Sequence, residues 1–185
     1  MKNIILLFIS IIIISCSPKT SSINKTSTML YTVTPDEKLK ELGVVIPKAG
    51  APVANYVNAV RTGNLVYTAG KGPNRPDGSL VTGKVGQDLT VEEGYEAAKL
   101  AAIQCLAALK DEIGDLSKVK RIVKVLGMVN CPADFKNQPA VINGCSDFLV
   151  KVFGDRGKHA RSAVGMGSLP SNIAVEIEII VEVQE

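Results

Sequence analysis

The chain has 185 residues, enough for one domain with a substantial hydrophobic core and too few for two comfortable ones. Its 21 basic and 18 acidic residues give a formal net charge of +3, an excess too weak to indicate a nucleic-acid-binding protein. With one histidine and four cysteines that show no CxxC spacing, the sequence has no metal-ligand pattern.

The first residues carry the features of a secretory signal. A positive start precedes an apolar run from Ile4 to Ile14, which is too short to anchor a protein stably across a bilayer. The run leads into Ser15-Cys16, which resembles a bacterial lipobox, because lipidation needs a small residue before the cut and a thiol after it. The alternative is an ordinary secretory signal followed by a chance cysteine.

This interpretation divides the chain into three parts. We expect residues 1–15 to be a signal peptide, with lipidation at Cys16. Residues 16–34, rich in Ser, Thr, Lys and Asn, would form a flexible tether. The domain at 35–185 would then lie in the bacterial cell envelope, held by its lipid at a membrane outside the cytoplasm.

The predicted domain begins with a short helix and a hairpin. Thr34-Pro35-Asp36-Glu37 combines an N-cap threonine, a proline at the first helical position and a glutamate three residues after the cap. It predicts a helix to about Leu42 that ends at Gly43. Two extended runs, 55–61 and 65–69, flank Thr62-Gly63-Asn64 and predict a β-hairpin, which a loop at 71–86 follows.

Two helices and three strands complete the domain. The capping box at Thr90-Val91-Glu92-Glu93 opens a long helix that runs to about Ile113. Further along the chain, 119–129 predicts a strand, 137–153 a second amphipathic helix, and 161–166 and 173–183 the last two strands. The order ββαβαββ is typical of an α+β layer, with two helices packed on one face of a mostly antiparallel sheet. The predicted buried stripe of the first long helix is Val91, Tyr95, Ala98, Ala102, Cys105, Leu109 and Ile113.

The predicted sheet has a second face that mixes charged and large aliphatic side chains. In the last strand, alternation turns Val175, Ile177, Ile179 and Val181 toward the helices. The opposite face receives Glu176, Glu178, Ile180 and Glu182. The strand at 119–129 shows the same mixture at Lys120, Ile122, Lys124, Leu126 and Met128. Such a face is a poor open surface, so we expect subunits to pack there.

Three cysteines lie in the domain, at Cys105, Cys131 and Cys145. An odd number cannot pair completely within one chain, and we expect three small buried thiols. An oxidising compartment leaves a disulfide open as an alternative, although the sequence selects no pair.

The most informative segment is His159-Ala160-Arg161-Ser162-Ala163, which places a lone arginine in a small, apolar strand. Burying an unpaired guanidinium is costly, so Arg161 needs a protein partner or an anionic ligand. A partner could be Glu176 or Glu178 across a subunit interface. The small neighbours of Arg161 leave room beside it and favour the ligand.

Several short motifs, in their order and spacing, resemble those of the Rid (RidA/YjgF/L-PSP) family over roughly residues 50–183. They are Tyr56 before Gly63-Asn64, Tyr67-Thr68-Ala69-Gly70, Gln87, Asp134-Phe135, Val141-Ile142-Asn143, Ala160-Arg161-Ser162, Leu169-Pro170 and Val175-Glu176-Ile177-Glu178. The resemblance implies a chorismate-mutase-like fold and a homotrimer with ligand sites between subunits. Family enzymes hydrolyse enamines and imines such as 2-aminoacrylate to 2-oxo acids and ammonia, without a metal or organic cofactor.

Carried over by position, the resemblance implies roles for individual residues. Arg161 would grip the substrate carboxylate, which its planar fork binds bidentately. Glu176 would orient or activate the attacking water from the adjacent strand. The substrate site would be completed by Tyr56, Gly70, Lys71 and Asn143. Each residue also has a structural interpretation, such as packing for Tyr56 or capping for Asn143.

Three positions depart from the pattern of the better-known Rid enzymes. Lys71 stands where a glutamine is usual, His159 replaces a proline, and Ala163 replaces the reactive cysteine of some members. His159 could tune the site, but a lone histidine is more often a satisfied structural residue. These departures indicate a divergent subgroup.

The sequence leaves three functions open. The first is an imine or enamine deaminase with an intersubunit site. The second is a non-catalytic trimer that binds a small carboxylate metabolite or a partner, which an envelope location favours because 2-aminoacrylate is usually made in the cytoplasm. The third is a ribonuclease, for which one histidine, balanced charge and few aromatic residues give little support, so no nucleic acid is expected as a partner.

Overall fold

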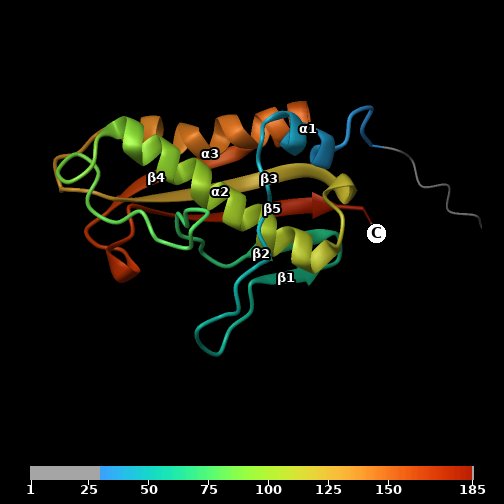
Figure 1. Ribbon diagram of the computed structural model, residues 1–185, viewed down its shortest axis with the longest axis horizontal. Helices are drawn as coiled ribbons and strands as arrows, with labels where there is room; N and C mark the ends of the chain where they lie inside the picture. The colour runs from blue at the N-terminus through green and yellow to red at the C-terminus, as the bar shows by residue number, and fades with distance from the viewer. Residues whose placement is uncertain (1–29, 185) are drawn as a thin grey trace, which may run out of the picture.

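The computed structural model describes residues 30–184, which form a five-stranded sheet with two long helices packed on one face (Figure 1). The elements are α1 (Pro35–Glu41), β1 (Ala59–Thr62), β2 (Leu65–Thr68), α2 (Val91–Ile113), β3 (Val119–Asn130), α3 (Gln138–Phe153), β4 (Ala160–Met166) and β5 (Val175–Val183). Short 3-10 turns occupy Leu116–Lys118, Gly154–Gly157 and Pro170–Asn172. The predicted α+β order ββαβαββ is confirmed, whereas the signal peptide, Cys16 and most of the tether lie outside the described residues.

The sheet has the strand order β1-β2-β5-β3-β4. All neighbouring strands are antiparallel except β3 and β4, which run parallel and are joined by the crossover helix α3. β4 is therefore an edge strand, with β3 between it and β5. The prediction that Glu176 acts from a strand adjacent to that of Arg161 is wrong within one chain.

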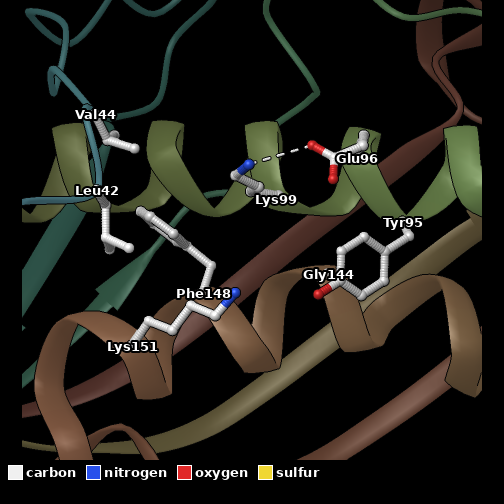
Figure 2. A pocket seen from close by; sticks show the side chains of 8 residues that line it. All are labelled: Leu42, Val44, Tyr95, Glu96, Lys99, Gly144, Phe148 and Lys151. Carbon is white, nitrogen blue, oxygen red and sulfur yellow. Dashed lines mark hydrogen bonds and ion pairs between the residues drawn. The ribbon is translucent and has the colours of Figure 1, made fainter.

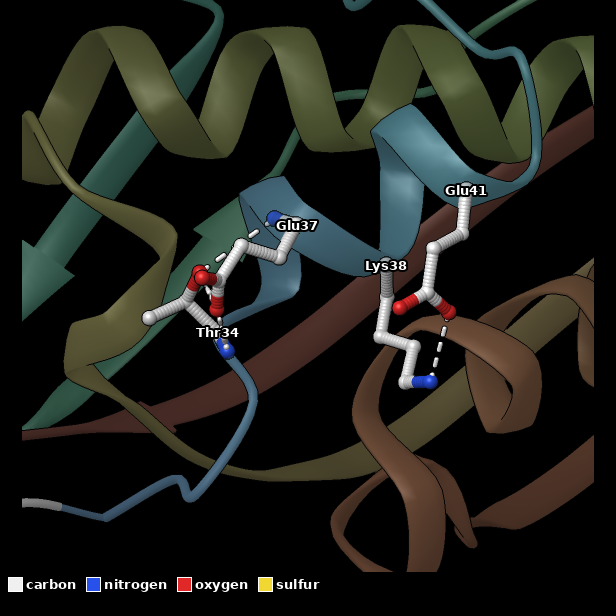
Figure 3. Close-up of polar contacts among 4 residues, drawn as sticks. All are labelled: Thr34, Glu37, Lys38 and Glu41. Carbon is white, nitrogen blue, oxygen red and sulfur yellow. Dashed lines mark hydrogen bonds and ion pairs between the residues drawn. The ribbon is translucent and has the colours of Figure 1, made fainter.

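Both predicted capping boxes are present. The Glu37 N–H donates to Thr34 Oγ1 at 3.2 Å, and the Thr34 N–H donates to the Glu37 carboxylate at 2.7 Å (Figure 3). The same reciprocal pair joins Thr90 and Glu93 at the start of α2. These bonds satisfy N–H groups that a helix leaves unpaired at its first turn, which explains why both starts were readable from sequence.

The core lies between the sheet and the two long helices. The predicted inward residues of β5 are at most 1% exposed. On α2 the inner surface is largely alanine, which lets the helix approach the sheet closely. Tyr95, predicted for this stripe, is instead half-buried at the outer side of the layer, where its hydroxyl donates to Asp147 of α3. The three described cysteines are buried and unpaired, as expected.

The opposite face of the sheet points away from α2 and α3. It exposes apolar side chains, with Val60 at 54%, Tyr67 at 41% and Val164 at 40%. Ile122 was predicted for this face and lies fully buried in the core. Two register irregularities between β3 and β5, one on either side of Ile122, shift the alternation of side chains there.

Within residues 30–184, no helix is long and apolar enough to cross a membrane.

Candidate functional site

Arg161 lies on the edge strand β4, with its side chain on the helix side of the sheet. It stands opposite Val125 of β3, a core residue, and residues directly opposite each other share a face. Its Nη1 donates to Asn143 Oδ1 at 2.8 Å and to Ser146 Oγ at 3.0 Å, both on α3. The structure thus brings together two of the predicted site residues, Arg161 and Asn143.

The guanidinium of Arg161 has unused hydrogen-bonding capacity. Its Nη2 and Nε make no hydrogen bond within residues 30–184, and no carboxylate of that part of the chain forms an ion pair with it. The residue is partly exposed. An arginine held through one nitrogen by neutral acceptors, with the other nitrogens open, is suited to bind a carboxylate bidentately.

Ser146 and His159 extend the contacts of Arg161. Ser146 Oγ lies 3.1 Å from His159 Nε2, and His159 Nδ1 lies 2.6 Å from the Gly157 carbonyl oxygen. Burial lowers the pKa of His159; the hydrogen bond to Gly157 opposes this shift, and the charge of Arg161 adds to it. Ser146 is not among the predicted site residues, although its position three residues after Asn143 places both on one face of α3.

Glu176 lies on the face of the sheet opposite to that of Arg161. A Cβ placed on Gly70 would fall 1.9 Å from Glu176 Oε1, so only glycine fits beside this carboxylate. Burial raises the pKa of Glu176, and the neighbouring Glu178 carboxylate raises it further. A carboxylate with a pKa shifted toward neutrality is suited to act as a general base. Gly70 and Glu176, both predicted, are therefore in contact.

Lys71 and Tyr56 belong to neither of these pairs. Lys71 stands opposite the core residue Ile177, and its Nζ donates to Asn58 Oδ1 at 2.5 Å. Burial lowers the pKa of Lys71, while the Cys105 thiol opposes the shift. Tyr56 lies before β1 and is 49% exposed, and its hydroxyl makes no hydrogen bond within the described part of the chain.

A single chain does not assemble the whole predicted site. Arg161 and Asn143 lie on the helix side at the edge of the sheet, whereas Gly70 and Glu176 lie two strands away on the other side. Two strand spacings amount to about 10 Å, and the sheet itself stands between the groups. A ligand of three or four carbons therefore cannot contact both groups of the same chain.

Two hollows in the described surface lie close to these elements. One of about 100 Å³ lies between α2 and α3, with Leu42 and Val44 at one end (Figure 2). The other, of about 470 Å³, borders the same side of β4 at Gly165 and includes Lys84, Cys131 and Gln138. Neither is lined by a predicted site residue. Among residues 30–184, no group of three or more His, Cys, Asp or Glu is placed to hold a metal ion.

Comparison with known proteins identifies the family. The profile of the family described as "YjgF/chorismate_mutase-like, putative endoribonuclease" matches residues 36–183. The chain belongs to this YjgF family. A solved structure, that of the protein Atu1372 from Agrobacterium tumefaciens, described as having unknown function, is 45% identical with a TM-score of 0.76. The match covers 81% of this chain and 92% of that one.

Two curated relatives are similar to this YjgF-family protein over most of its length. Protein TCP17 of Trypanosoma cruzi is 42% identical over 145 residues, which cover 78% of this chain and 91% of the relative. A protein of Dermatophagoides farinae named 2-iminobutanoate/2-iminopropanoate deaminase is 30% identical over 139 residues, covering 75% of this chain and 93% of the relative. The family predicted from the order of the motifs is thereby confirmed.

Proposed function

We propose that this protein is a deaminase that hydrolyses 2-aminoacrylate-like enamines and imines to 2-oxo acids and ammonia, in clefts between the subunits of a homotrimer. The observation that carries the proposal is the guanidinium of Arg161, which α3 holds through Nη1 while its other nitrogens stay open. The deaminase name of the Dermatophagoides farinae relative supports this class of reaction. Tyr56 would line the cleft beside the Gly70–Glu176 pair, and Lys71, whose side chain lies on the helix side, would border it through its backbone. We also propose that a lipid on Cys16 anchors the protein to a membrane in the cell envelope.

The proposed chemistry needs few groups. The substrate carboxylate binds Nη2 and Nε of Arg161, and this contact fixes the imine carbon relative to the protein. Glu176 of a second subunit accepts a proton from water as the water oxygen bonds to the imine carbon. The imine nitrogen takes up this proton, which gives an amino alcohol. The hydroxyl proton of that intermediate then moves to the nitrogen as the carbon–nitrogen bond breaks, and ammonia and the 2-oxo acid leave. An imine carbon is already electrophilic, so positioning supplies most of what catalysis requires.

A second candidate is a trimer that binds a small carboxylate without turnover. The separation of Arg161 from Glu176 within one chain favours it, since the Arg161 side needs no carboxylate base to hold an anion. The two candidates differ in whether ammonia is released.

The first experiment compares Arg161→Met with Arg161→Lys on freshly generated 2-iminopropanoate, with ammonia release as the readout. We expect Arg161→Met to lower kcat/KM by about 100-fold or more, because it removes two charged hydrogen bonds, each worth roughly 1.5 kcal/mol or more. Arg161→Lys should recover part of the loss, since it keeps the charge without the fork.

Arg75→Met, which removes an exposed arginine of the loop at 71–86, is the matched control and should react like the wild type. Equal rates in Arg161→Met and the wild type would remove the basis of the proposal. Binding of pyruvate by a wild type that releases no ammonia would establish the second candidate instead.

A further inference from the structure

We infer that Ser146 and His159 are positioning residues for Arg161, joined to it in a chain of hydrogen bonds that fixes the guanidinium and leaves its outer nitrogens free. The inference deepens the proposed function and rests on it, because that function gives Arg161 the substrate carboxylate. Three contacts form the chain: Arg161 Nη1 to Ser146 Oγ at 3.0 Å, Ser146 Oγ to His159 Nε2 at 3.1 Å, and His159 Nδ1 to the Gly157 carbonyl at 2.6 Å.

The chemistry of the end groups sets the direction of every bond in this chain. A carbonyl oxygen only accepts, so the proton of the neutral imidazole sits on Nδ1 of His159. Nε2 is then an acceptor, and the hydroxyl of Ser146 donates a hydrogen bond to it. A guanidinium only donates, so Ser146 Oγ accepts from Arg161. Each group donates to the next, and the series ends on the backbone.

The Gly157 carbonyl, which ends the chain of hydrogen bonds, is rigidly placed. Gly157 closes the 3-10 turn Gly154–Gly157, which connects α3 to β4. A Cβ on Gly157 would lie 2.3 Å from the Leu149 carbonyl oxygen, so the turn packs directly against the backbone of α3. The accepting carbonyl is therefore fixed relative to Ser146, and His159 spans a defined gap between them. Rotamers locked in this way reduce the entropy cost of binding a ligand at Arg161.

The charges around His159 agree with this role. Arg161 on β4 is the charged group that acts on the imidazole, while α3 presents the uncharged Ser146. Lys158 precedes His159, but it is exposed and pairs with Asp155 at 2.6 Å. The neutral imidazole leaves Arg161 as the cation of the cluster. The Arg161 guanidinium is then the one cationic group in the cluster that a substrate carboxylate can bind.

A nucleophilic role for Ser146 fits the contacts less well. Its oxygen accepts from a guanidinium, which withdraws electron density from the atom that would attack. Ser146 also lies within α3, where backbone N–H groups bond to carbonyls of the preceding turn. They are not free to stabilise an oxyanion beside Ser146.

The test uses His159 as a reporter, because it is the single histidine of the chain. Nitrogen-15 NMR of the full chain should show the Nδ1–H tautomer. Ser146→Ala should raise the pKa of His159, because it removes the proton donor that favours the neutral ring. The same variant should raise KM for 2-iminopropanoate and Kd for pyruvate roughly 10-fold, with a smaller change in kcat. Ser146→Thr keeps the hydroxyl and should leave the pKa, KM and Kd near their wild-type values.

Tyr95→Phe is the matched control, since it removes a hydroxyl bonded to Asp147, the next residue of α3, and should match the wild type. The inference is overturned if Ser146→Ala keeps the wild-type KM and His159 titration. Covalent labelling of Ser146 by a fluorophosphonate would overturn it too, in favour of a nucleophile. A wild type that neither binds pyruvate nor releases ammonia contradicts the proposed function, whereas the tautomer and the pKa response still decide whether the chain of hydrogen bonds exists.

Discussion

At the scale of single residues, Arg161 and Glu176 are held in environments of different kinds. The neutral oxygens of Asn143 and Ser146 accept hydrogen bonds from the guanidinium, so they orient it and do not neutralise its positive charge. The surroundings of Glu176 instead disfavour its charge, because partial burial and the Glu178 carboxylate both raise its pKa. The first arrangement suits the binding of an anion, and the second suits the uptake of a proton.

Glu178→Gln tests this second arrangement through the pH dependence of the reaction. Glu176 acts as a base when ionised, so kcat/KM should fall as the pH drops through its raised pKa. Removing the Glu178 charge lowers that pKa, and the acid limb should move to lower pH. Glu182→Gln, on the same face of β5 but bound to Lys120, should leave the limb in place. An acid limb that does not move in Glu178→Gln would show that Glu176 is not the group that titrates.

The sequence revealed the residues of the site unevenly, for physical reasons. Arg161 stood out because an unpaired guanidinium in an apolar strand is costly wherever the strand lies. Ser146 gave no such signal, because a serine on a helix surface carries no energetic penalty. Its role depends on the turn that brings His159 back to α3. The separation of Glu176 from Arg161 was missed because it depends on the order of the strands.

At the scale of elements, the crossing of α2 and α3 sets the position of the site. A Cβ on Gly144 would lie 1.9 Å from the Tyr95 carbonyl oxygen, so the two helix backbones touch at this residue. On α3, Asn143 directly precedes Gly144, and Ser146 follows it by two residues. The closeness of this contact therefore determines where both acceptors of Arg161 stand.

Gly144→Ala should reduce both stability and substrate binding. The added methyl meets backbone, which yields less than a side chain, so we expect a loss of about 3 kcal/mol in the free energy of unfolding. Moving α3 outward should also raise KM, because Asn143 and Ser146 move with it. Chemical denaturation and steady-state kinetics measure the two effects. Gly50→Ala adds its methyl to open space and should change neither, whereas a Gly144→Ala protein as stable as the wild type would contradict the close crossing.

Local chemistry explains which elements were predictable. Helices α1 and α2 start at Thr-Pro-Asp-Glu and Thr-Val-Glu-Glu boxes, whose bonds form within four residues and need no distant partner. The burial of Ile122 was mispredicted because the irregular pairing of β3 depends on β5, more than fifty residues away. The parallel pairing of β3 with β4 likewise depends on α3 as a crossover, and alternation alone does not specify it.

At the scale of the whole molecule, the sheet face opposite the helices is the natural place for other subunits. It combines Val60, Tyr67 and Val164, each at least 40% exposed, with the carboxylates of β5. Large apolar side chains exposed on one sheet face are typical of faces that bind another protein. In the proposed homotrimer, packing on this face would bring Glu176 of one subunit within reach of Arg161 of the next.

Mixing two inactive variants tests this arrangement directly. Arg161→Met and Glu176→Gln should each lose most activity as pure trimers, because every cleft lacks one group. In trimers assembled from equal amounts of both, a cleft that draws Arg161 from one variant and Glu176 from the other is intact. Random assembly makes about one quarter of the clefts intact, so roughly that fraction of wild-type ammonia release should return. Light scattering checks for trimers, and native mass spectrometry checks that they are mixed. Mixed trimers without recovered activity would show that Arg161 and Glu176 do not share an intersubunit cleft.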